Sequence, residues 1–428
     1  MHPGGLITDT SDSAVAARTP TGRWVIIGLL FFAILVNYID RGNLSIVAVP
    51  VMREFGVSAS RMGTLLSAFF WTYALLQVPA GYLVDRFGLK WTYAGAFLLW
   101  SLASAAVGMA GTFAQILFLR LLLGVGEAAA QPASLAFIRR NFPADQQGLP
   151  TAIYLSGMSF GPALGAIVGA SLLSAVGWRP LFIITGLGAC IWILPWLVLI
   201  PRDAPARPIQ AVRRNKVAWR VLLQRPTVWG ITCGAFFYSY FWYYCLTWLP
   251  SYLVMARGFS FLKMGAFTAA PFLGTALISM LSGRIADRLI ARFGQPILVR
   301  KIFVVSGFLL GSSILLLLAW KSAPAVLAVL MLSLMGIGVA SANYWALTQA
   351  ASPVSMIGRV IGCQNTVANL AGICAPILTG FLVDRTKSFD ISIAFAGVSL
   401  LVAAAAFLFL VRQRDVDELN ALYHTFTQ

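Results

Sequence analysis

Long stretches without a charged residue dominate this chain of 428 residues. A helix needs about 20 apolar residues to cross a bilayer, and the charges divide the chain into pieces of about that length or longer. The charge-free runs are 62–84, 91–119, 146–178, 180–201, 226–256, 264–283, 302–320, 322–358, 360–383 and 391–411. Charges interrupt two further apolar segments, 24–48 and 115–138. We therefore predict an all-α membrane protein with twelve transmembrane helices.

The composition excludes the main soluble classes. Hydrophobic residues make up 59% of the chain and charged residues 11%, whereas an ordinary soluble protein is about 25% charged. The mean hydropathy of +0.82 rules out intrinsic disorder and a soluble multidomain enzyme. Open strands cannot cross a bilayer, and the alternating pattern of a β-barrel is absent. The first span follows a polar tail without a small-residue cleavage site, so we expect it to be a retained anchor.

The basic excess indicates how the chain is oriented. The formal net charge is +17, but its charges lie between apolar runs, so we do not expect a nucleic-acid partner. With the N-terminus inside, 21 of the 31 Lys and Arg residues fall in inner segments, eight in outer loops and two within spans. The positive-inside rule then predicts two cytoplasmic termini.

The longest inner loop divides the chain into equal sets of spans. We expect an N-terminal tail at 1–22, six-helix bundles at 23–200 and 226–411, and a C-terminal tail at 412–428. The loop at 201–225 between the bundles is basic, with Arg213, Arg214, Lys216, Arg220 and Arg225. We interpret it as a tether and orientation signal, and contact with anionic lipid is the alternative.

The two halves repeat short motifs. The first half joins its second and third spans through Gly81, Asp85, Arg86, Gly88 and Lys90, and the second half repeats Gly283, Asp287 and Arg288 at an offset of 202. The segment 124–128 matches 336–340 at an offset of 212. Parallel repeats around a central basic loop are typical of transporters whose binding site lies near the membrane midplane.

At the 81–90 loop the chain resembles the major facilitator superfamily, and the resemblance covers nearly the whole chain. Glycines permit a sharp turn and close helix approach, while Asp85 can pair at the cytoplasmic ends of helices that move. The resemblance implies that this loop latches one conformation and does not contact the substrate.

A narrower resemblance rests on four segments. Residues 37–45, 69–79, 120–128 and 246–253 look like the corresponding motifs of the anion:cation symporter family. That family includes bacterial hexonate, hexuronate, tartrate and phthalate carriers, and vesicular glutamate and sialic acid transporters are its relatives. It implies proton-coupled uptake of a small organic anion, such as a sugar acid or another carboxylate, by alternating access. It also implies a multi-pass protein of the bacterial inner membrane.

Four ionisable residues lie inside the predicted spans: Asp40, Arg41, Arg120 and Glu127. A charge at a helix centre costs about 2.5–3.5 kcal/mol, so such residues normally face a cavity or a partner. Arg120 and Glu127 share one helix face about 10 Å apart, whereas Asp40 and Arg41 point in different directions. A static buried network between spans one and four is the alternative to a functional site.

The resemblance assigns a role to each of these charges. Asp40 and Glu127 match the proton-coupling carboxylates of the family, and burial can bring proton exchange into the physiological range. Arg41 matches an arginine associated with anionic substrate, and a guanidinium can fork onto a carboxylate. Arg120 matches the partner of the span-four glutamate, and we count it with Arg41 among the candidate substrate-binding residues.

Neutral residues complete the candidate site. Tyr38 and Tyr73 match cavity tyrosines of the family. Aligning the halves on their prolines places Tyr240 opposite Asp40, and span seven is rich in aromatic residues. The further candidates are amides one turn apart in span eleven, Asn365 and Asn369.

Two departures from the family pattern bear on the substrate. The interior of span seven lacks the second arginine of the vesicular relatives, as the sugar-acid carriers do. Met158 stands where some sugar-acid carriers have glutamine. The methionine favours a more apolar or aromatic acid.

An organic-anion exchanger or efflux carrier of the same fold remains the main alternative function. A membrane-embedded transferase is disfavoured, because the spans contain no histidine and no acidic pair. The five cysteines form no CxxC motif, so we expect no metal or other cofactor. The expected partners are a small organic anion, protons and the bilayer, and we expect a monomer.

Overall fold

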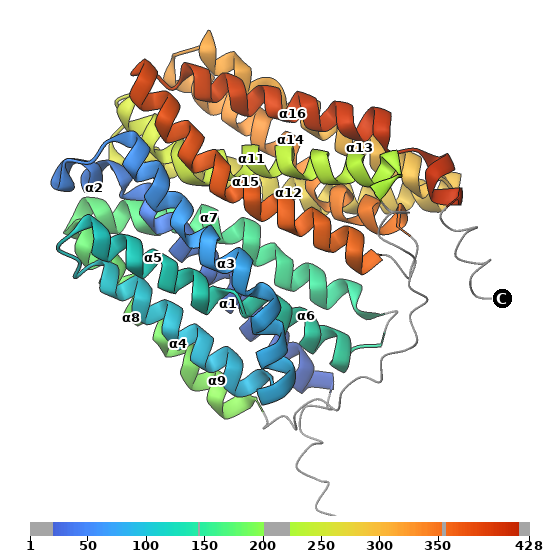
Figure 1. Cartoon of the computed structure of the whole chain (residues 1–428), viewed down its shortest axis with the longest axis horizontal. Helices are drawn as coiled ribbons and strands as arrows, with labels where there is room; N and C mark the ends of the chain where they lie inside the picture. The colour runs from blue at the N-terminus through green and yellow to red at the C-terminus, as the bar shows by residue number, and fades with distance from the viewer. Residues whose placement is uncertain (1–19, 144–145, 201–222, 353–356, 419–428) are drawn as a thin grey trace, which may run out of the picture.

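The structure is a computed structural model that describes residues 20–143, 146–200, 223–352 and 357–418. Within these ranges the chain folds into a bundle of helices without strands (Figure 1). The helices of the first half are α1 (Pro20–Ile46), α2 (Ala48–Phe55), α3 (Ala59–Phe87), α4 (Leu89–Val107), α5 (Phe113–Glu127), α6 (Ala130–Asn141), α7 (Gly148–Val176), α8 (Trp178–Ala189) and α9 (Ile193–Leu199). Those of the second half are α11 (Pro226–Met255), α12 (Phe261–Phe293), α13 (Pro296–Gly311), α14 (Ala323–Ala350), α15 (Ile357–Thr386) and α16 (Asp390–Leu410).

Most of the predicted spans meet the length and hydropathy needed to cross a membrane. Nine such helical segments occur in the described part of the chain, some of them formed by two consecutive helices such as α5 with α6. The spans predicted at 62–84, 91–119 and 226–256 fall on α3, α4 and α11, which have 29, 19 and 30 residues. The all-α membrane fold is therefore confirmed, and the count of twelve spans stays a prediction.

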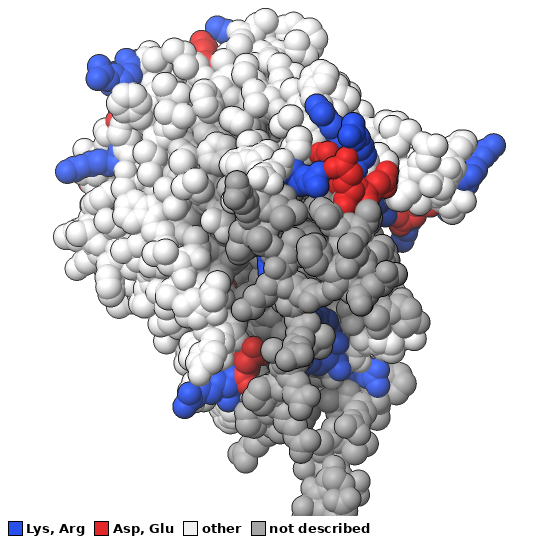
Figure 2. All heavy atoms as spheres, turned by 45° about the vertical axis from the view of Figure 1, so that its right-hand side comes forward, with Lys and Arg blue, Asp and Glu red and all other residues white. Residues whose placement is uncertain are grey.

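Charged side chains gather in a few groups on a surface that is otherwise largely uncharged (Figure 2). At one end of the bundle, Arg23 at the start of α1 donates to the carbonyl of Asn141 at the end of α6. At the same end of the second half, Thr227 in α11 bonds to the carbonyl of Leu410 in α16. We call this end of the bundle, where α1 begins and α16 ends, the terminal end. The distal end is formed by α2, the starts of α3 and α8, and the ends of α11 and α15.

The signature loop makes a tight turn at the terminal end. Gly88 ends α3 with a φ of 80°, which favours glycine. Asp85 accepts a hydrogen bond from Arg140 of α6 at 2.6 Å, and Arg86 donates to the hydroxyl of Tyr82. Lys90, at the start of α4, lies over the ring of Trp91.

The corresponding loop of the second half is held differently. Asp287 pairs with Arg300 of α13 at 2.9 Å, so its partner comes from the next helix and not from the fourth span. Gly283 lies close to Ala342 of α14, and Arg288 follows Asp287 on α12. The motif is thus repeated in sequence, but its pairing is not.

The two halves meet mainly through α3 against α15 and α7 against α12. Small residues allow these helices to touch. A side chain at Gly63 would approach the carbonyl oxygen of Pro376 to 2.3 Å, and one at Gly265 would approach Ala170 to 2.4 Å. Near the distal end, Asp384 of α15 accepts the backbone N–H groups of Ala59 and Ser60 at 3.0 and 2.7 Å. A carboxylate at a helix N-terminus is a favourable link between the halves.

The internal repeat is visible in hydrogen bonds. Thr72 of α3 donates to the carbonyl of Leu121 in α5, and Thr275 of α12 donates to that of Leu334 in α14. The glycine match at an offset of 212 does not hold in space, however. Gly124 faces α3, the second span of its half, whereas Gly336 faces α13, the third span of its half. In both halves these glycines lie at close helix contacts, but the helix that carries them is rotated differently toward its neighbours.

Some predictions fall on residues outside the described ranges. These include most of the N-terminal tail, the C-terminal tail beyond residue 418 and the basic loop with Arg213, Arg214, Lys216 and Arg220. Within the described residues next to that loop, Arg225 pairs with Glu418.

Candidate substrate and proton site

The centre of the site is an ion pair between spans one and four. Arg41 of α1 donates from Nε to Glu127 Oε2 of α5 at 2.7 Å, and both side chains are almost completely buried. The glutamate lies where α5 ends and the backbone turns before α6 begins. The second carboxylate oxygen, Oε1, is buried without a hydrogen-bond partner among the described residues. The pair therefore retains a free acceptor.

Three aromatic rings surround the Arg41 guanidinium. Its central carbon lies 4.7 Å from the ring centre of Tyr38, 4.5 Å from that of Phe69 and 4.6 Å from that of Tyr73. Such contacts favour a cation, more so where water is excluded. The rings therefore keep Arg41 charged and oriented within an apolar bundle. The structure thus brings together Arg41 and both tyrosines that the sequence singles out.

The second embedded acid has separate partners. Asp40 accepts a hydrogen bond from Ser104 of α4 at 2.8 Å and a longer one from Asn43. Arg120 donates to the backbone carbonyl of Asp40 at 3.3 Å. Asp40 Oδ2 and Arg120 Nε are buried without partners among the described residues. Polar atoms buried in this way normally bind water, a proton or a ligand.

One predicted pairing is wrong. The resemblance to the symporter family implies that Arg120 is the partner of Glu127. Glu127 instead pairs with Arg41, which comes from another helix, while Arg120 bonds to the α1 backbone. Spacing along one helix fixes a shared face, but the rotation of the neighbouring helix decides which base reaches the acid.

The tyrosine selected by repeat position does not join this cluster. Tyr240 is buried in the second half, where its ring lies 4.9 Å from that of Phe395 on α16. Tyr243, one turn further along α11, crosses to the first half. Its ring contacts Phe70 of α3 at 4.5 Å. The aromatic run of span seven pointed to this segment, but sequence did not distinguish the two tyrosines.

The span-eleven amides form a second contact between the halves. Asn365 Nδ2 donates to Gln77 Oε1 of α3 at 2.8 Å. Asn369 donates to the carbonyl of Asn365 within α15, so its amide nitrogen is satisfied locally. Gln77 belongs to the 69–79 motif but was not singled out as a contact. Ser104, which holds Asp40, carried no sequence signal.

Met158 is half-buried and packs against the apolar core of the first half. This packing explains why the side chain at position 158 is apolar, and the explanation needs no role for Met158 in selecting the substrate. Among the described residues, no group of three His, Cys, Asp or Glu side chains could hold a metal ion.

Comparisons with known proteins agree with this architecture. Residues 30–376 match the family model described as Major Facilitator Superfamily. A probable L-galactonate transporter of Escherichia coli K12 is 32% identical over 90% of this chain and 88% of its own length. The probable galactarate/D-glucarate transporter GarP of the same strain is 31% identical over 95% and 98%. The hexuronate transporter of Bacillus subtilis 168 is 31% identical over 90% and 94%.

A solved structure shows the same fold. It is a bacterial homologue of the human lysosomal transporter Spinster, described as inward-facing and unoccupied, with a TM-score of 0.70. It is 18% identical and covers 95% of this chain and 96% of its own. The three relatives named above are transporters of sugar acids by name, consistent with the anion:cation symporter family. The chain belongs to the major facilitator superfamily and is a transporter of that fold.

Proposed function

We propose that the protein is a proton-coupled importer of a small organic anion, with sugar acids as the first class to test. The observation that carries this proposal is the buried Arg41–Glu127 pair within its aromatic cage. The names of the relatives support the substrate class. Because those names include galactonate, galactarate and hexuronate, we place sugar acids ahead of the aromatic acids that Met158 favoured.

The pair suggests how a proton and an anion are coupled. An ionised Glu127 occupies Arg41 and competes with a substrate carboxylate for the same guanidinium. A proton on Glu127 removes that competition, so Arg41 can fork onto the substrate. Asp40 supplies a second carboxylate with an open oxygen. Protonation and anion binding then favour each other, as symport requires.

Alternating access would rock residues 23–200 against 226–411 around this cluster. The contacts of Asp384 with α3 hold the halves together near the distal end, whereas Gln77 and Asn365 link them nearer the terminal end. We assign both termini to the cytoplasm and the distal end to the outside of the bacterial inner membrane. This orientation follows the distribution of basic residues.

Uptake into proteoliposomes tests the proposal. The panel is D-galactonate, D-glucarate, a hexuronate, sulfoacetate and benzoate, each with and without an inward proton gradient. We expect the gradient to drive accumulation of at least one sugar acid, and a protonophore to abolish it. Equal uptake with and without the gradient, together with efficient counterflow, would instead indicate an exchanger.

The role of Arg41 has its own test. Arg41→Lys keeps the positive charge but removes the planar fork, so we expect the half-saturation constant for D-galactonate to rise about tenfold. Arg120→Lys is measured beside it and shows whether the second buried arginine, whose Nε has no partner among the described residues, contributes to the same affinity. An unchanged constant in Arg41→Lys would exclude bidentate recognition by this residue.

A further inference from the structure

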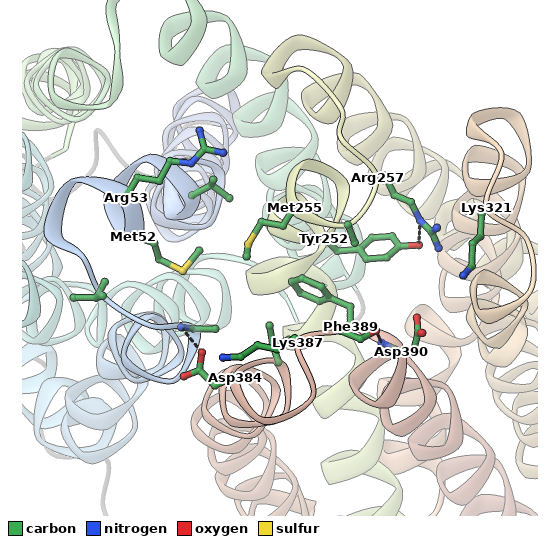
Figure 3. A pocket seen from close by; sticks show the side chains of 16 residues that line it. Met52, Arg53, Tyr252, Met255, Arg257, Lys321, Asp384, Lys387, Phe389 and Asp390 are labelled. Carbon is green, nitrogen blue, oxygen red and sulfur yellow. Dashed lines mark hydrogen bonds between the residues drawn. The ribbon is translucent and has the colours of Figure 1, made fainter.

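A cavity of 590 Å³ lies at the distal end (Figure 3). Neither Arg41 nor Glu127 lines it. Its walls come from α2 of the first half and, in the second half, from the end of α11, the segment before α14 and the junction of α15 with α16. Both halves therefore line it. We call it the distal cavity.

Basic side chains outnumber acids around the distal cavity. Its four bases are Arg53, Arg257, Lys321 and Lys387. Its two acids are Asp384 and Asp390, and Asp384 is already engaged by two backbone N–H groups of α3. Among the described residues, none of the four bases forms a salt bridge. The positive charge of the cavity is therefore only partly balanced.

One of the four bases is held in a fixed position. Arg257 donates from Nε to the hydroxyl of Tyr252 at 2.6 Å and from Nη2 to the carbonyl of Leu317 at 3.0 Å. Its guanidinium also lies over the Tyr252 ring. Among the described residues, Nη1 has no protein acceptor and stays available as a donor. A preorganised guanidinium in a cavity that is also lined by three exposed cations has the chemistry of a carboxylate site.

The positions of these bases are unusual for an outer surface. Membrane proteins concentrate Lys and Arg on the cytoplasmic side, and eight of the 31 in this chain fall in its predicted outer loops. Four of those eight line this one cavity. The outer loops contain three acids, Glu54, Asp384 and Asp390, and Glu54 is paired with Arg179 outside the cavity.

We propose that the distal cavity is an outer anion site that gathers the carboxylate substrate before the central site opens to it. The identity of the anion and the direction of transport rest on the proposed function. The cavity adds a preference by charge, because a cavity of positive potential enriches a dianion more than a monoanion. At the same electrostatic potential, the factor by which the cavity concentrates a dianion is the square of the factor for a monoanion. Salt screens such a site.

A matched pair of triple variants tests the site. The cavity variant is Arg53→Gln, Lys321→Gln and Lys387→Gln. The control variant is Arg61→Gln, Lys263→Gln and Arg385→Gln, which removes the same charge from predicted outer positions that do not line the cavity. Arg257 is left unchanged because it also ties α11 to Leu317.

Uptake is measured through the distal face at low ionic strength. The cavity variant should raise the half-saturation constant about threefold for D-galactonate and about tenfold for D-glucarate, and high salt should remove the difference. The control variant should behave like the unmodified protein. Equal shifts in both variants, or no shift in the cavity variant, would overturn the proposal.

Binding gives a readout that is independent of transport. In a protein carrying Arg41→Gln and Glu127→Gln, equilibrium dialysis at low salt should still detect weak binding of D-glucarate. This binding should disappear with the cavity substitutions and persist with the control substitutions. If the double variant binds no glucarate, the outer site is wrong even where the unmodified protein transports. If binding persists but the unmodified protein transports no organic anion, the outer site stands and the proposed function fails.

Discussion

The two halves of the molecule share a helical plan but differ in buried charge. In the first half, Asp40, Arg41, Arg120 and Glu127 are all buried. Among the described residues of 226–411, no charged side chain is buried, and the core is built from aromatic, aliphatic and small polar residues. Burying an ion pair carries a desolvation cost that an apolar core avoids. Because the second half forms the same kind of bundle without buried ions, we infer that the charges of the first half serve transport and not folding.

The largest effect is expected from removing the acids of the first half. Glu127→Gln or Asp40→Asn should reduce gradient-driven accumulation of D-galactonate to a ratio of about one, because the proton loses its coupling to the anion. Counterflow, which needs no proton gradient, should partly survive. Proteoliposome uptake with both assays measures this. If both variants still concentrate the substrate, coupling lies outside these two residues.

A second experiment asks whether the ion pair is needed for folding. Arg41→Gln leaves Glu127 buried without its cation, which should destabilise the protein by about 3–5 kcal/mol. Adding Glu127→Gln should restore most of that stability while transport stays lost. Thermal unfolding in detergent, with Arg41→Gln compared to the double variant, gives the measurement. A double variant as unstable as the single one would mean that the first half needs its charges to fold.

Sequence predicted the embedded charges because each depends on a local property. A charged residue within an apolar run is visible without knowledge of neighbours, and all four such residues are buried. Pairing is not local, because it depends on how α1 and α5 are rotated about their axes. The resemblance implies Arg120 as the partner of the glutamate, whereas the structure pairs Glu127 with Arg41. The contribution of Ser104 depends on the same geometry.

Repeats in sequence were a weaker guide than the embedded charges. The glycines at 124 and 126 match those at 336 and 338 in sequence. In the structure, however, the first glycine of each pair faces a different helix of its own half. A shift of two residues turns a helix by about 200°, so an offset taken from one motif cannot place a side chain elsewhere. Tyr240 was selected by such an offset, and the neighbouring Tyr243 makes the contact with the first half.

The comparison also predicts a division of roles, because neutral residues of the second half contact the first half. Tyr243 contacts Phe70, and Asn365 bonds to Gln77. Tyr243→Phe or Asn365→Ala should change the ranking of competing acids by about 3–10-fold, the effect of losing one or two neutral hydrogen bonds. The pH dependence of uptake should change little. Competition assays with galactonate, glucarate and a hexuronate measure the ranking, and Tyr240→Phe is the matched control. A shifted pH profile with an unchanged ranking would show that the second half takes part in proton handling.

The smallest effect is expected for an acid that belongs to the first half but lies at its surface. Hydrogen bonds from Arg179 and Trp178 lower the pKa of the Glu54 carboxyl at the distal end. A lowered pKa means that the pair contributes stability above the ordinary glutamate pKa and loses it only in more acidic solution. Glu54 is therefore ionised throughout an assay range of about pH 5.5–8.

Glu54→Gln should consequently leave the shape of the pH profile of uptake unchanged. Its effect on unfolding at neutral pH should be below about 1 kcal/mol, because the pair is exposed to solvent that screens it. The pH profile of uptake and the free energy of unfolding are measured for Glu54→Gln and for Glu127→Gln. The two variants then compare a surface acid with a buried acid of the same half. A displaced pH profile in Glu54→Gln would place part of the proton response at the distal end. The contrast between the halves would then reflect the outer surface as well as the buried cluster.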